Sequence, residues 1–221
     1  AGGRNVTRPH ALENTEALRL LLLCFLPGTA TAHLRDHAES IARYSRHDVT
    51  TVSNMGDLPP ALTLEDFDGI IIHYSVVMAR DNYLSPDARA RIRAYTGFKA
   101  AFIQDEYRLI NRTVAMLDYM GIDALFSVVP YPECLKLYPP ERLPSLRVYT
   151  ALTGYVNRDL IGRTTPSFAD RAVDVGYRAR RLGPDLGLEG QQKWQIAEDF
   201  ADAVEGTSLR CDLAFGEEDR F

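Results

Sequence analysis

The sequence has few cysteines and no long apolar segment. Its 221 residues include three cysteines, Cys24, Cys134 and Cys211, which is an odd number at wide spacing. Such spacing fits neither a disulfide framework nor a zinc motif, and it favours a reducing compartment such as the cytoplasm. The longest apolar run, residues 20–26, is far too short to cross a bilayer, and no signal-peptide cleavage region follows it. We therefore expect a cytoplasmic protein without a transmembrane segment.

The sequence also lacks an excess of positive charge. It has 25 Lys and Arg residues against 30 Asp and Glu residues, which gives a formal net charge of −5. This balance argues against a nucleic acid as partner. Apolar residues make up 46% of the chain, which is enough for the core of one large domain or of two small ones.

Segments with the pattern of strands alternate with segments with the pattern of helices over residues 15–150. Most of the strand-like segments are apolar along their whole length, which is typical of a parallel sheet covered on both faces. We therefore predict an α/β fold in which this region forms a doubly wound, Rossmann-like parallel sheet. The predicted strands are 18–26, 48–53, 69–76, 99–104 and 123–129, and the predicted helices are 31–44, 85–96 and 111–121.

The rest of the chain is predicted to form a leader, a linker and the beginning of a second α/β domain. Residues 1–14 have the character of a tag or leader, and the linker is placed at residues 151–170. The second domain is placed at residues 171–221, with a strand at 171–177, a helix at 191–204 and a strand at 209–215. A basic loop joins the first of these strands to the helix. Its Arg178, Arg180 and Arg181, with Lys193 on the helix, would suit a phosphate group, although solvated arginines are the common alternative.

Polar residues follow the predicted strands of the first domain, where the ligands of such sheets bind. Asp105 and Glu106 come directly after one strand, Gly28 follows another, and His73 and Tyr74 follow a third. The two carboxylates are therefore expected at the edge of a cleft. Their alternative role is structural, since they are also placed to cap the next helix or to pair with a nearby arginine.

Four further segments are informative together: "IIIHYSVVM", "FKAAFIQDEYR", "RAVDVGYRARRLGPDLGLEGQQKWQIAEDF" and "CDLAFGEEDRF". They resemble bacterial glycosyltransferases of the two-Rossmann-domain (GT-B) architecture, in particular the family-1-like and spore-maturation-like group. The resemblance implies transfer of a sugar from a nucleotide-sugar donor to a hydroxyl acceptor, such as a glycan or glycolipid. It also implies a bacterial cytoplasmic enzyme, either dissolved or at the surface of the inner membrane.

The resemblance further assigns the two domains and the donor site. The N-terminal domain is expected to face the acceptor, and the C-terminal domain is expected to bind the nucleotide sugar without a metal or other cofactor. Arg178 or Arg180, with Lys193, matches the basic residues that neutralise the departing diphosphate in such enzymes. A complete enzyme of this architecture has a whole second sheet, so the chain is expected to be an N-terminal part whose own activity is absent.

The acceptor side of the predicted site consists of residues that follow the strands. Asp105 or Glu106 is the candidate base for the acceptor proton, with His73 as the next candidate. The candidates for acceptor binding are Gly28, Tyr74 and Tyr107. The rings of the two tyrosines suit stacking on a sugar. For the histidine and the tyrosines, packing in the core is the alternative role.

Two other classes of function remain open from the sequence alone. The same crevice would serve a ligand-binding module that performs no chemistry. A metal-dependent hydrolase would use His73, Asp105 and Glu106 as metal ligands. A separate metal group of His33, Asp36 and His37 is conceivable on the first helix, where polar surface residues are the more usual explanation.

Overall fold

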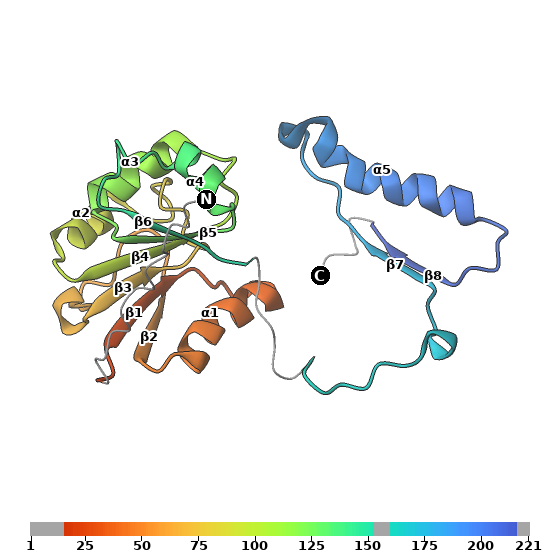
Figure 1. Cartoon of the computed structure of the whole chain (residues 1–221), viewed down its shortest axis with the longest axis horizontal. Coiled ribbons are helices and arrows are strands. Elements are labelled where there is room, and N and C mark those ends of the chain that lie inside the picture. Colours follow the sequence, from red (N-terminus) through yellow and green to blue (C-terminus); the bar gives the residue numbers. More distant parts are fainter. Residues whose placement is uncertain (1–15, 153–159, 216–221) are drawn as a thin grey trace, which may run out of the picture. The chain divides into compact units, whose positions relative to one another are not determined.

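The chain divides after residue 155 into two compact units, which are described separately here as the sheet unit and the small unit. The computed structural model describes residues 16–152 and 160–215 (Figure 1). The predicted leader and part of the predicted linker, residues 153–159, lie outside these described residues. No helix within them combines the length and the apolar character needed to cross a membrane.

The sheet unit alternates strands and helices as the sequence predicts. Its elements are β1 (Arg19–Cys24), α1 (Ala32–Tyr44), β2 (Asp48–Ser53), β3 (Gly69–Ile72), α2 (Pro86–Ala94), β4 (Phe98–Ile103), α3 (Ile110–Met120), β5 (Ala124–Ser127), α4 (Tyr131–Leu137) and β6 (Arg147–Thr150). The six strands form one parallel sheet in the order β2-β1-β3-β4-β5-β6. The prediction of an α/β fold with a parallel sheet is therefore confirmed. β6 adds a sixth strand, which the predicted set did not contain.

The strand order reverses at β1, which pairs with β2 on one side and with β3 on the other. This order is the flavodoxin-like variant of the doubly wound sheet, extended by one strand. Figure 1 shows α1 on one face of the sheet and α2, α3 and α4 on the other. In sheets of this kind, ligands bind at the carboxyl ends of the parallel strands.

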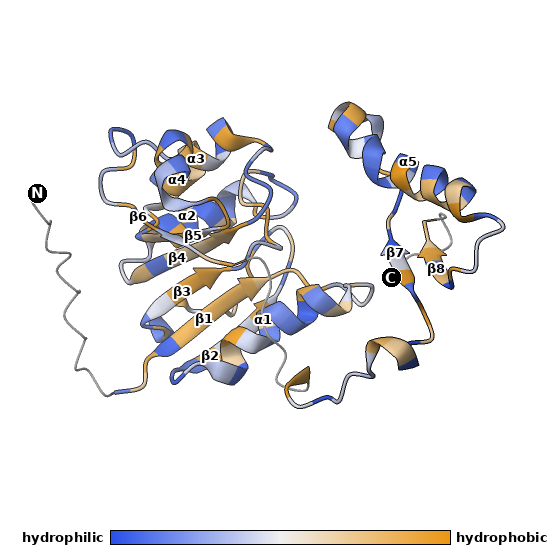
Figure 2. Ribbon diagram, turned by 45° about the vertical axis from the view of Figure 1, so that its right-hand side comes forward, coloured by the Kyte–Doolittle hydropathy of each residue, from blue (hydrophilic) through white to orange (hydrophobic). Residues whose placement is uncertain are grey.

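The core lies between the sheet and the helices α2 and α3. Figure 2 shows β1 and β3 hydrophobic along nearly their whole length, as expected of strands covered on both faces. Alternate strand residues enter one buried cluster with the helices, because successive strand side chains point to opposite faces. The members of this cluster include Leu21, Leu23, Ile70, Ile72, Ala101 and Leu125 from strands, and Ile92, Val114 and Leu117 from helices.

The helix ends agree with their sequence signals. Ser85 caps α2, since its hydroxyl accepts a hydrogen bond from the Ala88 N–H at 3.0 Å. Gly121 ends α3 with a φ of 65°, a left-handed conformation that glycine adopts without strain. Thr31 occupies the N-cap position of α1, as predicted, although its side chain makes no capping hydrogen bond.

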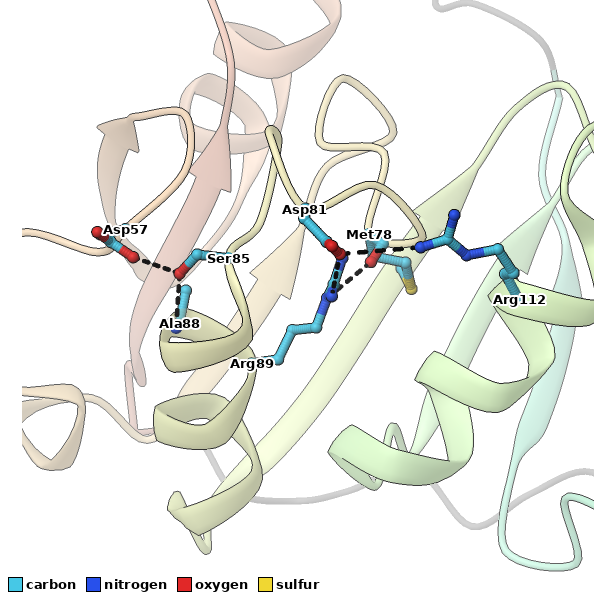
Figure 3. A network of polar contacts seen from close by, with 7 residues as sticks. All are labelled: Asp57, Met78, Asp81, Ser85, Ala88, Arg89 and Arg112. Carbon is cyan, nitrogen blue, oxygen red and sulfur yellow. Dashed lines mark hydrogen bonds and ion pairs between the residues drawn. The ribbon is translucent and has the colours of Figure 1, made fainter.

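A buried arginine holds the segment between β3 and α2. Arg89 of α2 donates through Nε to the Met78 carbonyl at 3.0 Å and through Nη1 to Asp81 Oδ1 at 2.7 Å (Figure 3). Arg112 at the start of α3 approaches the same carboxylate oxygen at 3.8 Å. Asp81 is exposed, whereas Arg89 is buried, so the carboxylate supplies the counter-charge for a cation that lies inside the protein.

We expect Asp81→Asn to lower the free energy of unfolding of the sheet unit at neutral pH, although the Asp81 side chain is exposed. The hydrogen bond and charge of Arg89 hold the pKa of Asp81 below its usual range. A lowered carboxyl pKa stabilises the fold above the unfolded-state value of about 4, and this contribution is lost as the pH falls through the native value. Urea unfolding should therefore separate variant and wild type at pH 7 and bring them together near pH 2.

The matched control for this experiment is Asp118→Asn, on the exposed surface of α3. It should unfold like the wild type at both pH values. An Asp81→Asn variant that is equally destabilised at both values would contradict the role of its charge.

The described part of the small unit contains two parallel strands, one long helix and two short 3-10 helices. Its elements are η3 (Phe168–Asp170), β7 (Val175–Arg178), η4 (Pro184–Leu186), α5 (Gly187–Val204) and β8 (Cys211–Ala214). β7 pairs with β8 in parallel, as a strand–helix–strand unit requires. The prediction for the helix was wrong at its start: α5 begins at Gly187 and not at residue 191. Two glycines in the segment Gly187–Gly190 suggested a loop, but the helix includes both.

Candidate functional site

The register of the sheet brings the ends of β4, β5 and β6 to one level. Ile103 pairs with Ser127, and Ser127 pairs with Thr150. The next residues along the chain, Gln104, Val128 and Ala151, therefore follow the strands side by side. All three line one pocket at this edge of the sheet.

Aromatic rings form part of the wall of this edge pocket, which is open to solvent. Phe102 and Phe126 are register partners on β4 and β5, and their rings stack with centroids 4.6 Å apart. Tyr149 of β6 stacks on Phe126 at 5.5 Å and continues the row. The residues that line the edge pocket are His37, Tyr74, Phe102, Ile103, Gln104, Phe126, Val128, Ala151 and Leu152.

His37 of α1 is the polar residue among these rings. Its imidazole lies 5.0 Å from the Tyr74 ring and 5.8 Å from the Phe102 ring, edge to face in both cases. Its Nδ1 is hydrogen-bonded to Nε2 of His73 at 2.8 Å. Burial lowers the pKa of His37, so the ring is neutral at physiological pH.

His73 lies behind the edge pocket and not in its wall. The residue is fully buried, and both ring nitrogens have partners: His37 at 2.8 Å, and Ser75 through its hydroxyl at 2.8 Å and its N–H at 3.1 Å. Burial, with a smaller contribution from His37, lowers the pKa of His73 to about 3. This placement gives no support to His73 as the base that contacts the acceptor.

The two adjacent carboxylates have different environments. Asp105 is exposed, and its φ of 65° turns the chain directly after Gln104 of the edge pocket. Glu106 is buried, and its carboxylate accepts a hydrogen bond from the hydroxyl of Ser127. The structure therefore leaves Asp105 as the accessible carboxylate and gives Glu106 a structural contact.

The predicted acceptor residues are only partly brought together. Tyr74 lines the edge pocket, but Tyr107 and Gly28 do not. Tyr107 is 68% exposed on the segment after β4, and Gly28 is exposed in the turn after β1. Sequence reasoning missed Phe102, Gln104 and Phe126.

The structure does not assemble the metal ligands that the sequence left open as alternatives. In the described parts of the chain, no three His, Cys, Asp or Glu side chains are placed to hold one metal ion. His37 turns toward His73, while Nε2 of His33 lies 3.3 Å from the Thr31 hydroxyl. The four-residue spacing of these two histidines therefore reflects two separate contacts.

The predicted donor residues lie on the small unit. Arg178 forms an ion pair with Asp212 of β8 at 2.6 Å, and Arg180 is exposed on the loop after β7. Arg181 stacks over the Trp194 ring at 4.4 Å. Because α5 begins at residue 187, Lys193 lies about 9 Å along the helix from its start, rather than at the start as predicted.

Comparison of the sequence with protein-family models and with curated proteins finds no match.

Proposed function

We propose that the sheet unit is the acceptor-binding domain of a glycosyltransferase, which transfers a sugar from a nucleotide sugar to a hydroxyl group of a glycan or glycolipid. The observation that carries this proposal is the edge pocket, where aromatic rings and polar groups lie together at the carboxyl ends of parallel strands. The resemblance of the sequence to glycosyltransferases, described above, supports the reaction class.

The composition of the edge pocket suits a monosaccharide. A sugar has apolar C–H groups that pack on aromatic rings and hydroxyl groups that need hydrogen-bond partners. Tyr74 and Phe102 supply rings, and His37 and Gln104 supply polar groups.

In the proposed reaction Asp105 takes the proton of the acceptor hydroxyl. The acceptor oxygen forms a bond to the anomeric carbon of the donor, and the bond from that carbon to the diphosphate oxygen breaks. The nucleoside diphosphate leaves with the electron pair. On the small unit, Arg180 and Lys193 are exposed cations whose charge suits a diphosphate group.

A binding module without chemistry is the second candidate. One observation favours it: no acidic side chain is among the described residues that line the edge pocket. Incubation of the full-length gene product with nucleotide sugars and glycan acceptors distinguishes the two, because only a transferase releases nucleoside diphosphate in the presence of acceptor.

We expect Tyr74→Leu to weaken the binding of methyl glycosides to the edge pocket by about fivefold, since an aromatic contact contributes about 0.5–1.5 kcal/mol. Saturation-transfer NMR with a panel of methyl glycosides identifies a ligand, and titration then measures its affinity. The matched control is Tyr107→Leu, which removes an exposed ring outside the pocket and should leave the affinity unchanged. Equal effects of the two substitutions would contradict a sugar site at this pocket.

A further inference from the structure

Four polar groups form a continuous chain from the β1 turn to the edge pocket. The Phe25 N–H donates to the Ser75 hydroxyl at 2.8 Å, and that hydroxyl lies 2.8 Å from Nδ1 of His73. Nε2 of His73 lies 2.8 Å from Nδ1 of His37, and His37 lines the pocket. We call these groups the histidine relay. It connects the segment after β1, the segment after β3 and helix α1.

The direction of every hydrogen bond in the histidine relay follows from a single backbone group. The Ser75 N–H points at Nδ1 of His73 at 3.1 Å, and a backbone N–H can only donate. Nδ1 of His73 must therefore accept, so neutral His73 carries its proton on Nε2. That proton is donated to Nδ1 of His37, and neutral His37 in turn carries its own proton on Nε2.

The Ser75 hydroxyl accepts from the Phe25 N–H, and its own proton shares the single Nδ1 lone pair of His73 with the Ser75 N–H. A proton on Nδ1 of His37 would face the Nε2 proton of His73. To avoid this clash of two N–H groups, His73 would have to carry its proton on Nδ1. That proton would then face the Ser75 N–H. The relay therefore opposes both the second tautomer and the charged form of His37.

We infer that the histidine relay holds His37 as a neutral hydrogen-bond donor, with Nε2–H directed away from His73 on the pocket side, so that His37 selects ligands that place an acceptor oxygen there. His73 and Ser75 are then positioning residues, which act on the ligand only through His37. A hydroxyl or ring oxygen of a sugar accepts such a bond, whereas an ammonium group has no lone pair for it. The identity of the ligand as a sugar depends on the proposed function, but the state of His37 does not.

The state of His37 is measured on the protein without ligand. Two-bond ¹H–¹⁵N NMR spectra of protein labelled with ¹⁵N-histidine at neutral pH distinguish the two tautomers of each ring. His37→Phe and His73→Phe assign the signals among the five histidines. We expect both His37 and His73 to carry the proton on Nε2. A His37 ring that carries it on Nδ1, or that shows averaged tautomers, would overturn the inference.

Variants of His73 test whether the relay controls recognition. His73→Gln retains an N–H group that can donate to His37, while His73→Leu removes it. We expect His73→Gln to keep the Nε2–H tautomer of His37 and the affinity for methyl glycosides. His73→Leu should give mixed tautomers and about fivefold weaker binding, and equal binding by the two variants would overturn the positioning role.

Failure of the proposed function is recognised separately. If His37 has the expected tautomer but no methyl glycoside perturbs its Nε2–H signal, the proposal that the edge pocket binds a sugar is wrong. The proposal that His37 selects a sugar is then wrong as well. The fixed tautomer would then stand as a property of the fold.

Discussion

Under the proposed function, replacement of Asp105 by asparagine should lower the rate of sugar transfer by about 10²- to 10⁴-fold, because the acceptor would lose its proposed proton-accepting group. Asparagine is the informative substitution at this position. Asp105 has a φ of 65°, and asparagine tolerates this left-handed conformation about as well as aspartate does. The backbone after the edge pocket should therefore keep its course, and thermal unfolding should be unchanged.

Glu106→Gln is the matched control for Asp105→Asn, since it neutralises the neighbouring carboxylate. Glu106 is buried against Ser127, so the substitution should affect stability and not turnover per folded molecule. Steady-state kinetics of the full-length gene product, with the folded fraction measured by circular dichroism, separates the two effects. Unchanged turnover in the Asp105 variant would exclude Asp105 as the base.

Ser127→Ala should lower the free energy of unfolding of the sheet unit by about 2 kcal/mol, the usual range for a hydrogen bond to a charged group being about 1.5–3 kcal/mol. The Ser127 hydroxyl donates to the Glu106 carboxylate and accepts from the Val129 N–H at 3.1 Å. Alanine would leave a buried carboxylate and a backbone N–H without these partners. Urea unfolding monitored by circular dichroism measures the loss.

Tyr138→Phe is the control for Ser127→Ala, at a buried residue on which the charge of Glu106 acts. The Tyr138 hydroxyl is buried and, within the described residues, makes no hydrogen bond. Its removal should leave the stability unchanged or slightly higher, because a buried unpaired hydroxyl is unfavourable. A double variant, Ser127→Ala with Glu106→Leu, should be more stable than Ser127→Ala alone, since the unpaired carboxylate is gone. A Ser127→Ala variant as stable as wild type would contradict the importance of the Glu106 contact.

The parallel sheet could be predicted because its central strands are apolar on both faces. β1, β3, β4 and β5 fall within one residue of the predicted segments at their starts, since each is a short apolar run between polar segments. β6 was not counted, because the exposed Arg147, Tyr149 and Thr150 give this edge strand a mixed composition. The start of α5 was missed because glycine usually ends a helix.

The candidate site was harder to predict, because it depends on contacts between distant residues. The sequence identified the carboxyl edge of the sheet, but it could not tell which of Asp105 and Glu106 faces outward, since that depends on the backbone turn between them. His37 and His73 are 36 positions apart, and only the packing of α1 against the sheet brings them together. Phe102 and Phe126 are paired across neighbouring strands, and this pairing is the clearest signal that was overlooked. Correct boundaries for the two strands would have revealed it.

The histidine relay has a consequence for the entropy of binding. A flexible side chain that is immobilised by a ligand costs about 0.5–1.5 kcal/mol of binding free energy. His37 is held on one side by His73 and packed against the rings of Tyr74 and Phe102, so its conformation is fixed before a ligand arrives. The loss of conformational freedom of the His37 side chain therefore occurs during folding, where buried hydrogen bonds offset it, and not when a ligand binds. A weakly bound ligand that makes few contacts, as the proposed monosaccharide would, benefits most from such preorganisation.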